Sequence, residues 1–109
     1  MHYQIIIPRN AYRGGIESLY QLANSLSKTK NKITLLFTPN YRDLFFSKGA
    51  IPNEMEKYNN QFIIDNDLVD KDNTTIIVPE IYTFYLQNIK KSKKCIYWLS
   101  VDNYFIGNK

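Results

Sequence analysis

Two adjacent glycines, Gly14 and Gly15, directly precede an amphipathic segment and are the residues best suited to bind an anion. Glycine amides approach a ligand closely because no side chain intervenes, and the N-terminus of a helix attracts negative charge. Arg13 stands just before the pair and offers a guanidinium group to a phosphate or a sugar. Structural roles are the alternative: the glycines serve a loop that needs a positive φ, and Arg13 is a solvated loop residue.

Four other polar residues follow apolar runs, at the points where a sheet would end. Glu80 comes directly after one run, and Ser100, Asp102 and Asn103 come after another. Each of these side chains can hydrogen-bond a ligand at the sheet's edge. The alternative is again structural, because Glu80 would offset a helix dipole and the other three would cap a helix.

Metal and cofactor chemistry is not expected. Cys95 is the one cysteine and His2 the one histidine, so neither an internal disulfide nor a cysteine-based zinc site is expected. Cys95 lies in an apolar run, where we expect a small buried hydrophobic side chain. A group of aspartates lacks the glycine and the final acid of a calcium loop, which favours a solvated acidic turn. The group comprises Asp65, Asp67, Asp70 and Asp72.

Nucleotide cofactor motifs are also missing from the sequence. Gly14 and Gly15 belong neither to a G-x-G-x-x-G fingerprint nor to a P-loop, since no Gly-Lys-Ser/Thr follows them. No acidic residue ends the first apolar run, which argues against a response regulator. We therefore expect no cofactor and no metal.

The composition indicates one folded domain with a mild positive charge. The 109 residues are 44% hydrophobic, and 14 basic against 10 acidic residues give a net charge of +4. The basic residues do not alternate with aromatic ones as in a nucleic-acid-binding module, so no nucleic acid partner is expected. A run of lysines should be solvated or face a helix C-terminus, and weak contact with anionic lipid headgroups is the alternative. The run comprises Lys90, Lys91, Lys93 and Lys94.

The sequence also bears on location. No stretch approaches the roughly 18 apolar residues of a membrane span. The run Ile5–Ile7 is too short for a signal peptide and has no basic leader. We therefore expect a cytoplasmic protein, with the inner face of the membrane as the place of any lipid contact.

Apolar runs and helical periodicity predict the elements. Continuous apolar runs predict buried strands, and a shorter run predicts a small additional strand. The strong runs are Tyr3–Ile7, Ile33–Phe37, Thr74–Val78 and Cys95–Leu99, and the shorter one is Phe62–Ile64. Apolar spacings of three and four predict amphipathic helices. These helices span Ile16 to Leu26 and Ile81 to Ile89, with short helical segments expected at Asp43–Ser47 and from Pro52 to Tyr58.

Strands that are apolar on both faces and alternate with amphipathic helices indicate an α/β fold. We predict a doubly wound, mainly parallel, Rossmann-like sheet with helices on both faces. Ligands bind such sheets beyond the carboxyl ends of the strands, where the strand order reverses. With the order 3-2-1-4-5, Pro8–Gly15 and Pro79–Glu80 flank this point, and Ser100–Tyr104 lies beside them.

Three segments resemble a known enzyme family. The run IIIPRNAYRGGIESLYQLANSLS looks like the opening of GT-B glycosyltransferases of the group 4 type, which have a strand, a Gly-Gly loop and a helix. VPEIYTFYL and CIYWLSVDNYF resemble segments of bacterial polysaccharide and lipopolysaccharide transferases of this kind. Together the three segments cover about half of the chain, in the expected order.

The resemblance implies a function for the residues singled out above. Gly14 and Gly15 would line the cleft between two domains, near the donor diphosphate or the acceptor, and Glu80 would be the acid of the family's His/Glu-Pro turn. Ser100 stands where many relatives carry a histidine, a departure from the family pattern. The implied partners are a nucleotide-sugar donor and a glycan or lipid-linked acceptor in bacterial surface glycan synthesis.

Residues 1–109 are expected to be a single, truncated half-domain. The family's C-terminal donor-binding domain, with its E-x7-E motif, is absent from the sequence, so we expect this chain alone to be inactive. A non-enzymatic α/β interaction domain or an inactive gene remnant is the alternative, and a flavodoxin-like module is a third. A sheet cut short would expose apolar surface and self-associate through its C-terminal flank. The residues expected there are Tyr97, Trp98, Tyr104 and Phe105.

Overall fold

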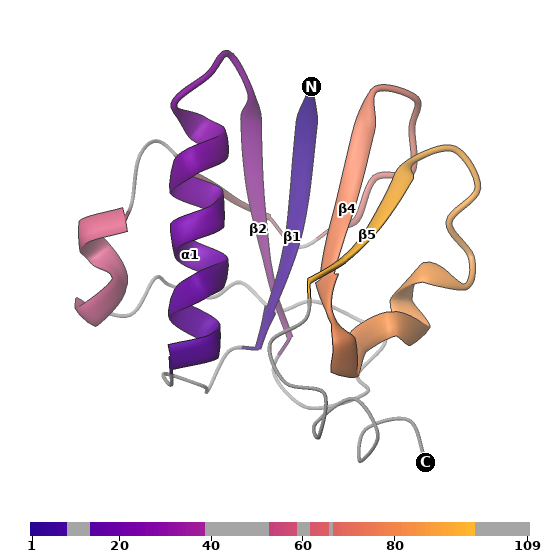
Figure 1. The fold of residues 1–109 in the computed structure, drawn as a ribbon. Coiled ribbons are helices and arrows are strands. Elements are labelled where there is room, and N and C mark those ends of the chain that lie inside the picture. Colours follow the sequence, from indigo (N-terminus) through magenta and orange to yellow (C-terminus); the bar gives the residue numbers. More distant parts are fainter. Residues whose placement is uncertain (9–13, 39–52, 59–61, 66, 98–109) are drawn as a thin grey trace.

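The fold is an α/β arrangement around one parallel sheet (Figure 1). The computed structural model describes residues 1–8, 14–38, 53–58, 62–65 and 67–97. Five parallel strands form the sheet in the order β3-β2-β1-β4-β5. They are β1 (His2–Pro8), β2 (Lys32–Thr38), β3 (Ile63–Asp65), β4 (Thr74–Pro79) and β5 (Lys93–Tyr97). The predicted parallel α/β sheet is therefore confirmed, and its strand order is the one assumed in locating the candidate site.

The three central strands, β2, β1 and β4, form the core of the sheet. They are rich in β-branched residues, which suit a pleated surface packed on both sides. Ile5, Ile6 and Ile7 of β1 are all fully buried, although they alternate between the two faces. Such two-sided burial explains why these strands read as continuous apolar runs.

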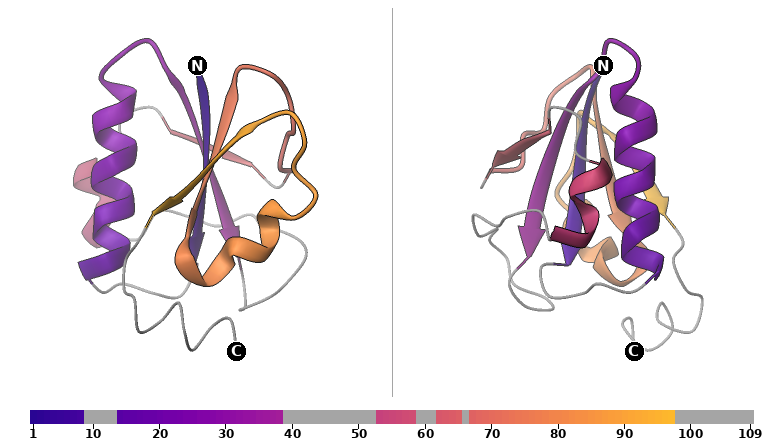
Figure 2. Two further views of the ribbon diagram at one scale, coloured as in Figure 1. Left: turned by 45° about the vertical axis from the view of Figure 1, so that its right-hand side comes forward. Right: turned by 90° about the vertical axis from the view of Figure 1, so that its left-hand side faces the viewer.

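Helix α1 (Gly14–Ser27) and the 3-10 helix η1 (Asn53–Tyr58) cover one face of the sheet. Leu19, Tyr20 and Ala23 of α1 pack into the apolar cluster that this face shares with β1 and β2. A polar contact fixes η1 against α1, because the Tyr58 hydroxyl donates a hydrogen bond to the Glu17 carboxylate at 3.1 Å. Figure 2 shows both helices on the same side of the sheet.

The opposite face carries the 3-10 helix η2 (Glu80–Leu86), so the sheet is covered on both sides. Tyr82 and Ile89 pack with Ile6, Leu36 and other residues of this face. The apolar spacing from Ile81 to Ile89 predicted one longer helix, but the backbone at Tyr82 departs from helical angles (φ −115°, ψ 24°). The ring of Tyr82 meets its aromatic neighbours edge-on, and this packing does not need a regular helix.

Two predictions about strand β5 are wrong. The apolar run Cys95–Leu99 was predicted to be the strand, whereas the strand spans Lys93–Tyr97 and pairs with β4 from Thr75↔Lys93 onward. Cys95 was predicted to be buried, and it is exposed. The physical reason is position: β5 is at the edge of the described sheet, and its residues Lys93 to Ile96 are exposed, so it needs no apolar run.

Two polar contacts tie the chain between β3 and β4 to the rest of the fold. The buried Gln4 side chain donates to the Val69 carbonyl at 2.6 Å and accepts from the Val69 N–H at 2.7 Å. The Asp70 carboxylate accepts from three consecutive backbone amides, those of Lys90, Lys91 and Ser92, at 2.8 to 3.0 Å. These contacts hold the segment before β4 to β1 and to the start of β5.

Candidate functional site

The candidate site lies at the carboxyl ends of the strands, at the point between β1 and β4 where the strand order reverses. β1 leads from this edge to α1 and on to β2 on one side, whereas β4 and β5 lie on the other (Figure 1). Three neighbouring strands end here, at Pro8, Thr38 and Pro79. Residues from several strands therefore end at the same side of the sheet.

The N-terminus of α1 belongs to this edge. The helix begins at Gly14, and Gly15 is its second residue. Among the glycines that the structure describes, none has a positive φ, so these two serve the helix rather than a left-handed turn. The first amides of a helix have no acceptor within it. They can therefore bind an anion.

Glu17 adds a negative charge close to the first amides of α1. It lies in the first turn of α1, where a carboxylate is stabilised by the helix dipole. Its carboxylate also forms a 3.5 Å ion pair with Lys57 and accepts the bond from Tyr58. The Lys57 pKa is raised by the nearby Tyr58 and by Glu17. The negative charge of Glu17 is thus partly balanced by η1.

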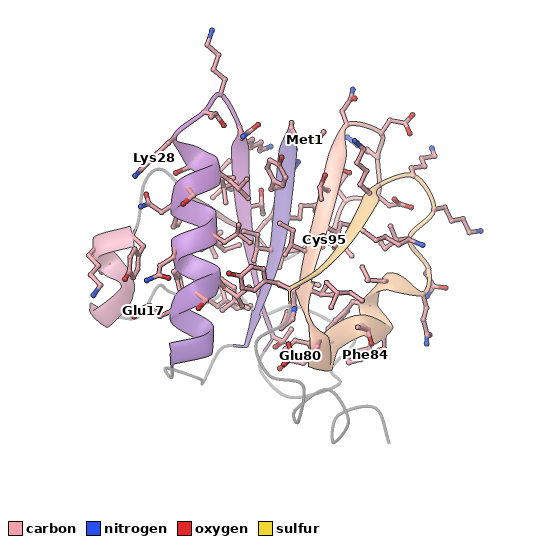
Figure 3. The ribbon with its side chains drawn as sticks, viewed as in Figure 1. Met1, Glu17, Lys28, Glu80, Phe84 and Cys95 are labelled. Carbon is pink, nitrogen blue, oxygen red and sulfur yellow. The ribbon has the colours of Figure 1, made fainter. Side chains whose placement is uncertain are left out.

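Glu80 is the buried carboxylate of the site. It follows Pro79 directly, opens η2, and is only 1% exposed. Figure 3 shows Glu80 at the end of β4, near Phe84. β1 and β4 pair as far as Ile5↔Ile77, and Glu80 follows the last residue of β4. Its position at the end of β4, beside the point where the strand order reverses, makes Glu80 a candidate ligand-binding group.

Thr38 was missed by sequence reasoning. It ends β2 opposite Pro8, is 1% exposed, and its Oγ1 has no hydrogen-bond partner among the residues described. Alternation along β2 places it on the same face as Leu36, which packs on the side of η2. A signal did exist, because Thr38 is a polar residue that ends an apolar run, as Glu80 does.

Three of the residues proposed from sequence lie at the carboxyl ends of the strands: Gly14 and Gly15 at the start of α1 on one face, and Glu80 at the start of η2 on the other. The remaining four, Arg13, Ser100, Asp102 and Asn103, lie outside the described residues, as do Trp98, Tyr104 and Phe105. Their proposed roles stay predictions.

Metal-binding and membrane-spanning features were searched for in the described ranges. Within them, no three His, Cys, Asp or Glu side chains gather closely enough to hold a metal ion. No helix described there has both the length and the apolar character to cross a membrane. The lysine side chains at positions 90, 91, 93 and 94 are exposed, as the solvated run predicted.

Comparison with known proteins gives no further guide to the family. No protein-family model, no curated protein and no solved structure matches the chain. The function is therefore inferred from the sheet topology, the groups at its carboxyl edge and the three short segments that resemble glycosyltransferases.

Proposed function

We propose that this chain is the acceptor-side, Rossmann-like domain of a GT-B glycosyltransferase of the group 4 type. The enzyme would transfer a sugar from a nucleotide-diphosphate donor to a glycan or lipid-linked acceptor in bacterial surface glycan synthesis. One observation carries the proposal. The Gly14–Gly15 helix start and the buried Glu80 occupy the same edge of a 3-2-1-4-5 sheet, beside its switch point.

The groups at this edge suit such a reaction. Loss of the sugar leaves a diphosphate with growing negative charge, and preorganised backbone amides at the start of α1 would stabilise that charge. Glu80 would accept a hydrogen bond from a sugar hydroxyl, and Arg13 would add a guanidinium contact to phosphate or sugar. Positioning of this kind needs no cofactor.

The resemblance places most donor contacts in a second domain, so this chain alone should bind donors weakly. We expect dissociation constants in the millimolar range, which correspond to a binding free energy of about −4 kcal/mol. Calorimetry with UDP-, GDP- and dTDP-sugars measures the affinity, and backbone amide NMR shifts of Gly14 and Gly15 locate the contact.

A pair of variants sharpens the test. Gly15→Val places a branched side chain over the helix start and should abolish the amide shifts. Ser25→Val puts the same residue near the other end of α1, where it is exposed, and should leave the shifts unchanged. The absence of any shift at these glycines at about 10 mM nucleotide-sugar, well above the expected Kd, would contradict the proposal. Micromolar affinity abolished by Gly15→Val would show that the donor site lies in this domain.

A non-enzymatic interaction domain is the second candidate, because an exposed edge strand is a surface on which another chain can pair. The exposed lysines before and within β5 are also compatible with weak contact with anionic lipid headgroups. The absence of nucleotide-sugar binding together with saturable binding to a protein partner would favour this second candidate.

A further inference from the structure

The described turns that lead into β2, β4 and β5 lie at one end of the molecule, opposite to the candidate site (Figure 1). Exposed lysines occur in all three. Figure 3 shows Lys28 at this end and Glu80 at the other. We call these lysines the amino-end surface. Lys28, Lys30 and Lys32 come from the turn into β2 and its first strand residue, Lys71 from the turn into β4, and Lys90, Lys91 and Lys93 from the turn into β5 and its first strand residue.

The sheet register sets the starts of four strands side by side. Lys32 of β2 pairs with His2 of β1, and His2 pairs with Thr74 of β4. Lys93 of β5 pairs with Thr75, one residue further along β4. Neighbouring strands lie about 4.8 Å apart, so these strand starts form a row about 14 Å long. The lysines at both ends of this row therefore belong to one continuous surface.

Hydrogen bonds join the turns into β4 and β5. The Lys71 N–H donates to the Ser92 hydroxyl at 3.1 Å, and that hydroxyl donates to the Lys71 carbonyl at 3.1 Å. The charges also act on a common point. The pKa of His2 is lowered by burial and then by the charges of Lys32 and Lys71, against an opposing effect of Asp65. Turns that are far apart in the sequence thus place their lysines together.

Negative charge at this end offsets only part of the lysine charge. Asp67, Asp70 and Asp72 are the acidic residues of the three turns, and they number fewer than half of the lysines. Asp70 is also held by three backbone amides of its own protein. Within the described ranges, the ion pair between Lys57 and Glu17 lies elsewhere, and no lysine of the amino-end surface forms one. This end of the molecule therefore carries a net positive charge.

We propose that the amino-end surface docks on an anionic lipid bilayer. The turns project from the same end of the sheet, so their ammonium groups can meet a flat, negatively charged surface together. A nucleic acid is a poorer match, because the described turns, residues 28–31, 67–73 and 87–92, contain no aromatic side chain on which a base could stack. The proposal does not depend on the glycosyltransferase assignment, because it uses no residue of the candidate site.

This orientation turns the candidate site away from the membrane. β1 runs from the amino end to the carboxyl end of the sheet with seven residues. A strand of that length spans about 20 Å. Gly14 and Gly15, at the other end, should therefore remain in water when the lysines contact the bilayer.

Cosedimentation with vesicles measures the contact. The chain should bind vesicles made of equal parts phosphatidylcholine and phosphatidylglycerol, and it should not bind vesicles of phosphatidylcholine alone. Binding should be lost at about 1 M salt, where the screening length falls to about 3 Å. Equal binding to both kinds of vesicle would overturn the proposal. Tighter binding to poly(U) RNA than to the mixed vesicles, at the same salt concentration, would also overturn it and identify a nucleic acid as the occupant.

Single lysine variants test whether all three turns take part. Lys30→Gln, Lys71→Gln and Lys91→Gln each remove one exposed charge from a different turn, and each should weaken binding to the mixed vesicles about fivefold. Lys57→Gln is the matched control, because Lys57 is exposed on η1 and its loss changes the net charge equally. Its effect should stay below about twofold. Circular dichroism checks that each variant is folded. An effect of Lys57→Gln as large as the others, or an effect of Lys91→Gln without one of Lys30→Gln, would refute a surface built from three turns.

A spin-labelled lipid headgroup locates the contact independently. In exchange with bilayer nanodiscs that carry this lipid, the backbone amide NMR signals of Thr29, Asn73 and Ser92 should broaden. Those of Gly14 and Gly15 should stay sharp. Broadening at the two glycines without broadening at the three turn residues would show that the opposite end faces the bilayer, and the proposal would be wrong.

Discussion

Three backbone amides hold the Asp70 carboxylate, as they could hold a bound anion. Its carboxylate accepts three bonds from the amides of Lys90, Lys91 and Ser92, at the start of the predicted lysine run. These backbone bonds hold the pKa of Asp70 well below its ordinary value. The Ser92 hydroxyl extends the contact to Thr74 at the start of β4. The acidic turn predicted from the sequence therefore includes one aspartate with a structural role.

This contact makes stability depend on pH. A carboxyl group whose pKa is lowered by folding stabilises the protein above its ordinary pKa, and the effect is lost as the pH falls below that value. We expect Asp70→Asn to melt at a lower temperature than the wild type at pH 7. The difference should shrink below about pH 4. Thermal melts followed by circular dichroism from pH 7 to pH 2 measure it, and a constant difference across this range would contradict the prediction.

The buried side-chain amide of Gln4 bonds both backbone groups of Val69, as a neighbouring strand would. Gln4→Leu keeps the approximate shape of the side chain but removes both partners of Val69, whose N–H and C=O then lose their bonds. We expect a loss of about 2–3 kcal/mol in the free energy of unfolding, measured with urea. Gln21→Leu is the matched control, because Gln21 is exposed and its side chain donates to the Tyr58 hydroxyl at 3.2 Å. Its cost should stay below about 0.5 kcal/mol, and equal costs would refute this reasoning.

At the scale of elements, the turn into β4 depends on one backbone conformation. Asn73 has a positive φ of 64°, a region that glycine and asparagine tolerate and β-branched residues do not. Its carbonyl accepts the His2 N–H at 3.2 Å, so the turn also holds the start of β1. Asn73→Val should cost about 1–2 kcal/mol of unfolding free energy, whereas Asn73→Gly should be nearly neutral. Chemical denaturation compares the two, and equal stability would contradict the assigned role of φ.

Strands in the middle of the sheet could be predicted from the sequence, whereas the edges could not be placed as well. Ile33–Phe37 and Thr74–Val78 are apolar on both faces because helices cover both, and this burial leaves a readable pattern. Lys93 to Ile96 of β5 are exposed, so this strand can begin with lysines, and the apolar run Cys95–Leu99 placed the predicted strand two positions too late. An edge strand is specified by its register with a neighbour, which no local pattern shows.

For the molecule as a whole, topology was the most useful predictor. The order 3-2-1-4-5 was enough to expect Gly14 and Glu80 at one edge, and the structure places both there. Long-range side-chain contacts such as that between Gln4 and Val69 were not predictable, because the two residues are 65 positions apart in the sequence. Thr38 was missed because a polar residue after a strand is common, and burial alone distinguishes it.

The position of β1 has a consequence for how the protein is made. Of the five described strands it is the first to leave the ribosome, yet it lies between β2 and β4 in the finished sheet. β2 follows by residue 38, but β4 begins only at Thr74. In the interval, a nascent chain would carry Ile5 to Ile7 with one unpaired backbone edge and no partner for Gln4. Completion must await long-range pairing, which slows folding and extends exposure to aggregation. Synthesis of residues 69–77 is therefore the step that ends the vulnerable period of the growing chain.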